Sequence, residues 1–154
     1  MRVKEPDSSF TPAPSGTHVA RCVQIIDLGT QHSEFYGTNS HKLLLGWELC
    51  NERQESGDRE GEPFMVWKQY TASLGKKAKL RGDLESWRGK SFTVEELRSF
   101  DLRRILDAPC MVNVVHTEND GIKYANVGAV MAIPTGTKIP ERVAELLHFS
   151  PFGS

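Results

Sequence analysis

The chain has no long apolar run, no cysteine pair and no large excess of either charge. Its longest apolar runs are only a few residues, such as the three leucines at 43–45, so none is long enough to span a membrane. The first residues, MRVKEPDSSFTPAPSG, lack the apolar stretch of a signal peptide. We therefore expect a soluble protein that stays in the cytoplasm and has no membrane partner.

Neither a disulfide framework nor a metal site is expected. The three cysteines, Cys22, Cys50 and Cys110, are scattered without a CxxC pair, and the five histidines are equally dispersed. An odd number of cysteines does not suit a closed disulfide framework, and a zinc site needs about four converging ligands, usually with close pairs in sequence. The pattern predicts no metal and no cofactor.

Motifs of catalysis are also missing. The chain has no G-x-x-x-x-G-K-[ST] loop, no G-x-S-x-G turn and no H-E-x-x-H helix. Cys110 and His116 share a strand face by parity, but they lie too far apart along it to form a nucleophile–base pair. We predict that the protein is not an enzyme.

The formal net charge of −1 conceals two regions of opposite sign. Residues 67–90 contain seven basic and two acidic residues, a balance of +5. Residues 51–62 contain five acids and two arginines, a balance of −3. This distribution predicts a positive surface beside an acidic loop, although the total is near neutral.

β-branched and alternating apolar residues predict five strands. The first does not alternate cleanly, since Val19, Val23 and Ile25 share one side with Arg21, and a bulge within the strand would reconcile its faces. The Asp-Gly pair at 120–121 is typical of a hairpin turn. We expect a loop at 29–39. The expected strands lie at residues 16–28, 42–49, 63–71, 110–116 and 122–133.

Helical patterns lie mainly between the third and fourth strands. Thr93 and Glu96 have the spacing of a capping box. Pro140 suits the first turn of a last short helix. The expected helical segments cover residues 78–87, 93–100, 101–106 and 141–149.

Three strands, a helical insert and a two-stranded hairpin follow the order of the OB-fold, a small Greek-key barrel. We therefore predict a mainly β protein with a five-stranded OB-fold-like barrel over residues 16–140. A flexible N-terminal arm at 1–15 would precede it, and a short helix and tail at 141–154 would follow. Such barrels commonly bind oligonucleotides through strands two and three and the loops after strands one and four, although they also bind sugars and proteins.

Two stretches, YTASLGKKAKLRGDLESWRGKSFTVEELRSFDLRRIL and APCMVNVVHTENDGIKYANVGAVMAIPTG, resemble a family of small OB-fold single-stranded DNA-binding proteins of tailed phages and prophages. The resemblance covers residues 16–140 and rests on pattern, such as LESWRG at 84–89 and YAN at 124–126. It implies non-catalytic, sequence-tolerant binding of single-stranded DNA during phage replication or recombination, in the cytoplasm of a bacterial host. Other replication or recombination proteins are the implied partners, and self-association is left open.

Binding of single strands without sequence preference requires cations along the phosphates and flat side chains on which bases stack. The third strand offers both. If Met65 and Trp67 point inward, Lys68 and Tyr70 lie on the outer face, and we adopt this orientation. The opposite orientation would expose Trp67 instead, and Tyr70 would then belong to the core.

Two tryptophans are assigned to the interior. Trp47 shares its strand face with Leu43, Leu45 and Leu49, which favours the core over a stacking role. Trp87 lies at helical spacing from Leu80 and Leu84, which favours packing of a helix against the barrel.

Two further groups of candidate binding residues each allow two interpretations. Phe35 and Tyr36 lie in the polar loop after the first strand, where they either contact a ligand or fold back onto the barrel. The basic cluster at 76–81 either follows a DNA backbone or is a solvated helix face. The full set of predicted nucleic-acid-binding residues is Arg21, Phe35, Tyr36, Lys42, Lys68, Tyr70, Lys76, Lys77, Lys79, Arg81 and Tyr124.

Two other functions are compatible with the same pattern. The chain would serve equally as an OB-like adaptor that binds a phage polymerase, recombinase or host factor, because its charge is near neutral and its loop carries aromatic residues. It would also suit a phage structural or assembly protein. Negligible DNA affinity at low salt favours the adaptor, and large stable oligomers within virions favour the structural role.

Overall fold

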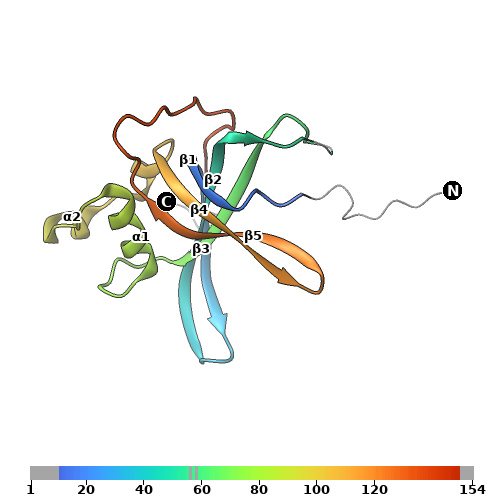
Figure 1. The fold of residues 1–154 in the computed structure, drawn as a ribbon. Coiled ribbons are helices and arrows are strands. Elements are labelled where there is room, and N and C mark those ends of the chain that lie inside the picture. Colours follow the sequence, from blue (N-terminus) through green and yellow to red (C-terminus); the bar gives the residue numbers. More distant parts are fainter. Residues whose placement is uncertain (1–10, 56, 58, 150–154) are drawn as a thin grey trace.

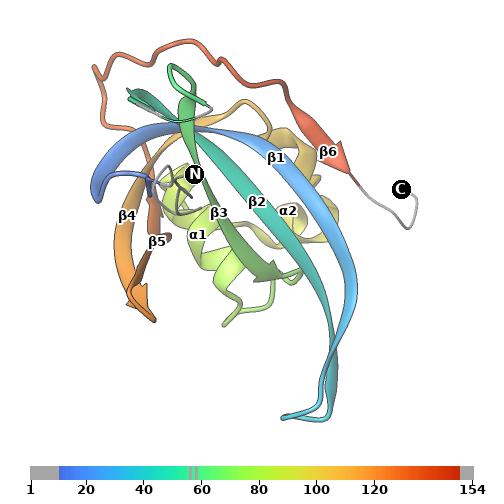
Figure 2. The same ribbon diagram turned by 90° about the vertical axis from the view of Figure 1, so that its right-hand side faces the viewer.

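The computed structural model describes residues 11–55, 57 and 59–149. Its centre is a strongly curved sheet with the hydrogen-bonded strand order β3-β2-β1-β4-β5, in which every neighbouring pair is antiparallel (Figures 1 and 2). The strands are β1 (Gly16–Ser33), β2 (Thr38–Arg53), β3 (Pro63–Thr71), β4 (Pro109–Asn119) and β5 (Ile122–Met131). Within these residues no helix is long and apolar enough to cross a membrane.

The long strand β1 bends because it contains two irregularities. Its register with β2 shifts between Cys22 and Gln24 and again between Asp27 and Gly29. The bulge predicted within this strand is therefore confirmed. Bulges of this kind increase local twist and bend, which lets one strand pair with β2 along its length and with β4 along residues 16–21.

The loop predicted at residues 29–39 is wrong, because β1 and β2 continue through it as a two-stranded arm. Pairing runs to Ser33 and Thr38, so only a short turn at 34–37 remains. Gly29 adopts a φ of 69° at the second irregularity, where it lets the strand resume after the bulge. The arm projects well beyond the body of the sheet (Figure 2).

The hairpin predicted at the Asp-Gly pair is confirmed. β4 and β5 pair from Asn119 and Ile122 outward across a two-residue turn. Asp120 and Gly121 both have positive φ, 53° and 78°, as a type I′ turn requires.

Helix α1 (Lys79–Arg88) packs its apolar face onto the sheet, as predicted from the spacing of Leu80, Leu84 and Trp87, all of which are buried. The ring of Trp87 lies 6.2 Å from that of Trp47, and its Nε1 donates to the carbonyl oxygen of Pro109 at 2.9 Å. α1 contacts both β5 and β3, the two ends of the strand order, which are not hydrogen-bonded to each other among the described residues. The helix therefore lies across the open side of the sheet.

The next helix, α2 (Val94–Ser99), begins at the predicted capping box. Thr93 Oγ1 accepts a bond from the Glu96 amide, and Glu96 Oε1 accepts one from the Thr93 amide. A single 3₁₀ turn, η2 (Leu102–Ile105), follows where a further turn was predicted. The Arg88–Glu96 ion pair and the bond from the Phe92 amide to Glu85 Oε2 join this segment to α1.

Acid should loosen this helical segment before it affects the strands. Amide donors lower the pKa of Glu85 and of Glu96, and Arg103 lowers the pKa of Asp101 to about 2. Since the folded-state pKa is depressed in each case, the stabilisation is complete above the ordinary values of 4.5 and 3.8 and is lost as the pH falls below them. We expect the protection factors of the amides of residues 92–105, taken relative to the intrinsic exchange rate at each pH, to fall between about pH 4.5 and 2. Earlier loss of protection in the β4–β5 hairpin would contradict this order.

The short helix predicted at 141–149 is wrong. Residues 141–146 are irregular, and β6 (Leu147–Phe149) pairs in parallel with Gln24–Ile26 of β1. The backbone amides of Val143 and Ala144 donate to the carboxylate of Glu48, which is fully buried. A buried acceptor elsewhere in the chain therefore holds this segment extended, and this outweighs its local preference for helix.

Candidate nucleic-acid interface

The outward face of the sheet carries an exposed tryptophan held above a glycine. Gly46 of β2 pairs with Gln24 of β1 and with Trp67 of β3. A Cβ atom at Gly46 would lie 2.7 Å from Trp67 Nε1, so the indole occupies the space that any other residue would fill. Nε1 also donates to Gln24 Oε1 at 3.0 Å, and 43% of Trp67 remains exposed. Gly46 and Gln24 thus hold the indole ring in place, and the rest of its surface is exposed to solvent.

A second row of side chains extends this face beyond the indole. Leu44 of β2 pairs with Ile26 of β1 and Gln69 of β3, and all three lie on the outward side with Trp67. On the far edge, β6 places Leu147 beside Gln24 and Phe149 beside Ile26. Since paired residues point to the same side of a sheet, the exposed side chains of β6 join the same face. The result is a strip of apolar and amide groups across four strands.

Cations lie where β3 ends. Lys42 Nζ donates to Thr71 Oγ1 at 2.6 Å across the last outward-facing pair of β2 and β3. The amide of Ala72 donates to the carbonyl oxygen of His41, which ties the following segment to β2. That segment and the start of α1 carry Lys76, Lys77 and Lys79, all exposed and with no ion pair among the described residues.

Arg81, the fourth member of the predicted basic cluster, is already engaged. It is half-buried, pairs with Glu85 at 3.4 Å and donates to the Leu74 carbonyl oxygen. Its role is therefore to hold the segment before α1 rather than to add a free cation to it.

The orientation predicted for β3 is wrong. Tyr70 is buried, and its hydroxyl donates to Asp83 Oδ2 at 2.6 Å. Lys68 Nζ contacts the same carboxylate oxygen at 2.9 Å. Burial and Asp83 both raise the pKa of Tyr70, so its hydroxyl stays protonated as the donor. α1 supplies the carboxylate that lets a lysine face inward, and Trp67 is consequently the exposed aromatic of the strand.

The aromatic residues of the β1–β2 turn do not fold back onto the sheet. Phe35 and Tyr36 are 88% and 75% exposed, and they contact each other edge to face at 4.8 Å. The arm beneath them is braced by His32 with Asn39 and by His41 with Asp27, at 2.7 and 2.6 Å. An aromatic pair therefore stands at the end of a structured arm.

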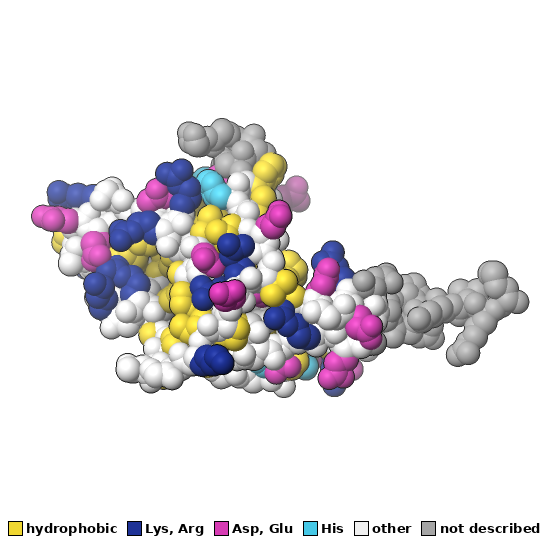
Figure 3. Space-filling view, turned by 90° about the horizontal axis from the view of Figure 1, so that it is seen from above, with side chains coloured by type: hydrophobic (Ala, Val, Ile, Leu, Met, Phe, Trp, Pro, Cys, Tyr) yellow, Lys and Arg dark blue, Asp and Glu magenta, His cyan; other side chains and the backbone are white. Residues whose placement is uncertain are grey.

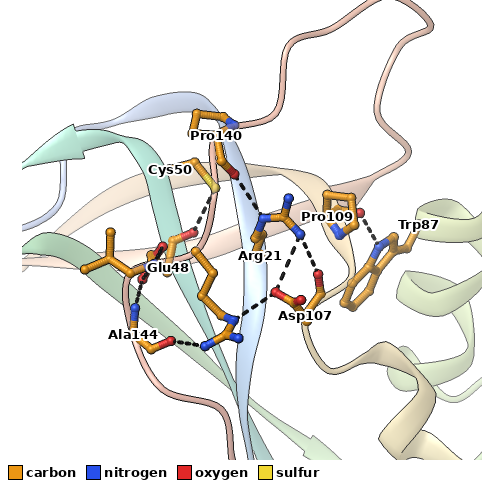
Figure 4. A network of polar contacts seen from close by, with 10 residues as sticks. Arg21, Glu48, Cys50, Trp87, Asp107, Pro109, Pro140 and Ala144 are labelled. Carbon is orange, nitrogen blue, oxygen red and sulfur yellow. Dashed lines mark hydrogen bonds and ion pairs between the residues drawn. The ribbon is translucent and has the colours of Figure 1, made fainter.

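Arg21 lies in a polar network that holds the C-terminal segment (Figure 4). Its guanidinium donates to the carbonyl oxygens of Pro140 and Asp107, and it forms an ion pair with the Asp107 carboxylate at 3.5 Å. Arg142 contacts the same carboxylate at 3.0 Å. The Arg21 guanidinium, which was predicted to contact DNA, is thus already bonded to other groups of the protein.

Tyr124, the last predicted residue, lies on β5, at the opposite end of the strand order from β3 and Trp67. It is 44% exposed on β5, where it pairs with Thr117 of β4. The β4–β5 hairpin projects separately from the β1–β2 arm (Figure 1).

The cysteines offer no reactive thiol at neutral pH. All three are buried, and burial raises the pKa of Cys22 to about 12 and of Cys50 to about 11. Among the described residues no group of three or more His, Cys, Asp or Glu side chains is arranged to hold a metal ion.

The residues that sequence reasoning missed on this face are those brought together by register. Trp67 was named only as the alternative orientation, and Gln24, Ile26, Leu44 and the β6 side chains were not considered. Gly46 was the available signal, because a glycine within a strand often marks close approach of another group.

No protein-family model matches the chain, and no curated protein sequence matches it.

Proposed function

We propose that this protein binds single-stranded DNA without catalysis, through the outward face of β1, β2 and β3. The observation that carries the proposal is Trp67, held over Gly46 with its remaining surface exposed. An exposed aromatic on a rigid sheet offers a stacking surface for any base, because every base has a face to stack. The sequence resemblance to phage and prophage proteins supports a role for this activity in replication or recombination.

The strand order supports an OB-type barrel as the framework. β1 pairs with both β2 and β4, β3 pairs with β2, and β5 pairs with β4. The helix between β3 and β4 lies against both ends of this order. In OB-folds the ligand lies across strands two and three and the loops after strands one and four. In this chain those places hold Trp67, the aromatic pair at 35–36 and the β4–β5 turn.

The positive charges near this face suit a DNA single strand that lies along β2 and β3. Lys42 lies at one end of the strip, and the segment that carries Lys76, Lys77 and Lys79 begins beside it, where the Ala72 amide donates to the His41 carbonyl oxygen. Backbone phosphates would contact the lysines while bases stack on Trp67. With about four phosphates neutralised, the logarithm of the affinity should fall with the logarithm of salt concentration with a slope of about −3.

The proposal is tested by fluorescence anisotropy with a labelled mixed-sequence oligonucleotide, single-stranded and duplex, at two salt concentrations. Trp67→Ala should weaken single-strand binding about 5- to 150-fold, since stacking contributes about 1–3 kcal/mol per base. Trp67→Phe is the matched control and should retain most of the affinity, because it keeps an aromatic ring. Gly46→Ala should also weaken binding by displacing the indole.

Two results would overturn the proposal. One is the absence of single-strand binding at either salt concentration, which would favour the protein-interaction adaptor. The other is equal affinity of the Trp67→Ala variant and the unmodified protein, with thermal unfolding showing that both are folded.

A further inference from the structure

A pocket lies on the helical side of the molecule, away from the outward face of β1–β3. Its volume is about 450 Å³, and it opens between α1, α2, η2 and the start of β4. Figure 2 shows these helices behind the sheet. The pocket is lined by Leu84, Trp87, Arg88, Lys90, Glu96, Phe100, Arg104, Ile105, Ala108 and Pro109.

The pocket combines an apolar floor with an excess of positive charge. Leu84, Trp87 and Ile105 are buried. Around them stand three cations and a single carboxylate, that of Glu96, so the lining carries a net charge of +2. In the space-filling view, Lys and Arg side chains gather on the helical side (left) with hydrophobic side chains between them (Figure 3).

Two features leave this charge available to a ligand. Lys90 and Arg104 are exposed and have no ion pair among the described residues. Arg88 pairs with Glu96 through Nη2 and lies over the Phe92 ring, but its Nη1 is buried and has no hydrogen-bond partner. A buried guanidinium donor without an acceptor is costly, so a shift of the Arg88 side chain that brought Nη1 to an added oxygen atom would be favourable.

We propose that this pocket binds an acidic segment of a partner protein. A large apolar side chain of the segment occupies the floor formed by Leu84, Trp87 and Ile105. Carboxylates of the segment approach Lys90 and Arg104 at the rim, and one accepts from Arg88 Nη1 after a shift of that side chain opens the atom to the pocket. A mononucleotide fits this lining less well, because its base edge would meet apolar side chains with few polar partners. The site is independent of the proposed DNA-binding face.

The test uses a fluorescein-labelled short peptide of consecutive aspartates that ends in leucine and phenylalanine. The variant Lys90→Ala/Arg104→Ala changes only exposed rim residues and should weaken peptide binding about tenfold or more, as the loss of two charge-assisted contacts implies. Lys76→Ala/Lys77→Ala removes the same charge outside the pocket and should leave peptide affinity unchanged. In NMR spectra the indole N–H of Trp87 should shift when the peptide binds.

Equal loss of affinity in both double variants would overturn the proposal, because it would indicate non-specific attraction. Unchanged affinity for a peptide in which alanines replace leucine and phenylalanine would overturn it as well. A mononucleotide that shifts the Trp87 signal when the peptide does not would replace it with a nucleotide site. The Trp67→Ala variant should bind the peptide normally, so a failure of peptide binding can be distinguished from a failure of DNA binding.

Discussion

Trp47→Ala should lower the free energy of unfolding by about 3–5 kcal/mol, the largest loss expected from any single tryptophan of this chain. Trp47 is fully buried, and it pairs with Cys22 of β1 and Val66 of β3 across the inner face of the sheet. Its ring also contacts that of Trp87, so it joins the sheet to α1. Truncation would leave a cavity at the point where these layers meet.

Trp67→Ala provides the matched control, because it makes the same chemical change on the opposite face of the same sheet. Because 43% of the surface of Trp67 is exposed, its replacement by alanine should lower the free energy of unfolding by no more than about 1 kcal/mol. Urea unfolding of both variants, followed by far-UV circular dichroism, measures the two changes. A similar loss of unfolding free energy in both variants would contradict the structure, in which Trp47 lies on the buried face of the sheet and Trp67 on the exposed face.

Glu48→Ala should release the segment that crosses the upper end of the outward face. The Glu48 carboxylate accepts from the amides of Val143 and Ala144 at 2.9 and 2.6 Å, with no exposure to solvent. Hydrogen bonds to a charged group contribute about 1.5–3 kcal/mol each. Their loss should accelerate amide exchange at these two residues about 100-fold or more. Hydrogen–deuterium exchange measures this directly.

The change in global stability should be smaller than the local one, because the variant also removes a buried charge. Glu55→Ala is the control, since Glu55 is an exposed acid of the loop after β2, and it should leave exchange at 143–144 unchanged. Persistent protection of Val143 and Ala144 in the Glu48→Ala protein would show that Arg21, Arg142 and β6 hold the segment without the carboxylate.

The candidate site illustrates why face assignment was harder than element assignment. The pattern of β3, PFMVWKQYT, has aromatic residues on both sides, so apolar periodicity alone does not choose between them. The choice depends on Asp83, 15 residues beyond Lys68, whose carboxylate contacts both Lys68 and Tyr70. The row that joins Gln24, Gly46 and Trp67 likewise depends on register between strands that are distant in sequence.

Local features were determined by the sequence alone. The Thr93–Glu96 capping box, the Asp120-Gly121 turn and the apolar face of α1 each depend on residues a few positions apart, whose backbone geometry and hydrogen bonds are satisfied within the segment. Burial of Trp47 follows in the same way, because its neighbours on one strand face are all leucines. The order of strands and helices up to β5 could therefore be predicted, but not β6.

Only the tertiary structure decided the length of the β1–β2 arm, the exposed face of β3 and the path of residues 141–149. In each case a partner on another element satisfies a group that local propensity leaves free: a facing strand for the arm, Asp83 for Lys68, and Glu48 for the amides of Val143 and Ala144. Buried polar groups must be paired, and the free energy of pairing them exceeds the small differences in intrinsic propensity between helix, strand and loop.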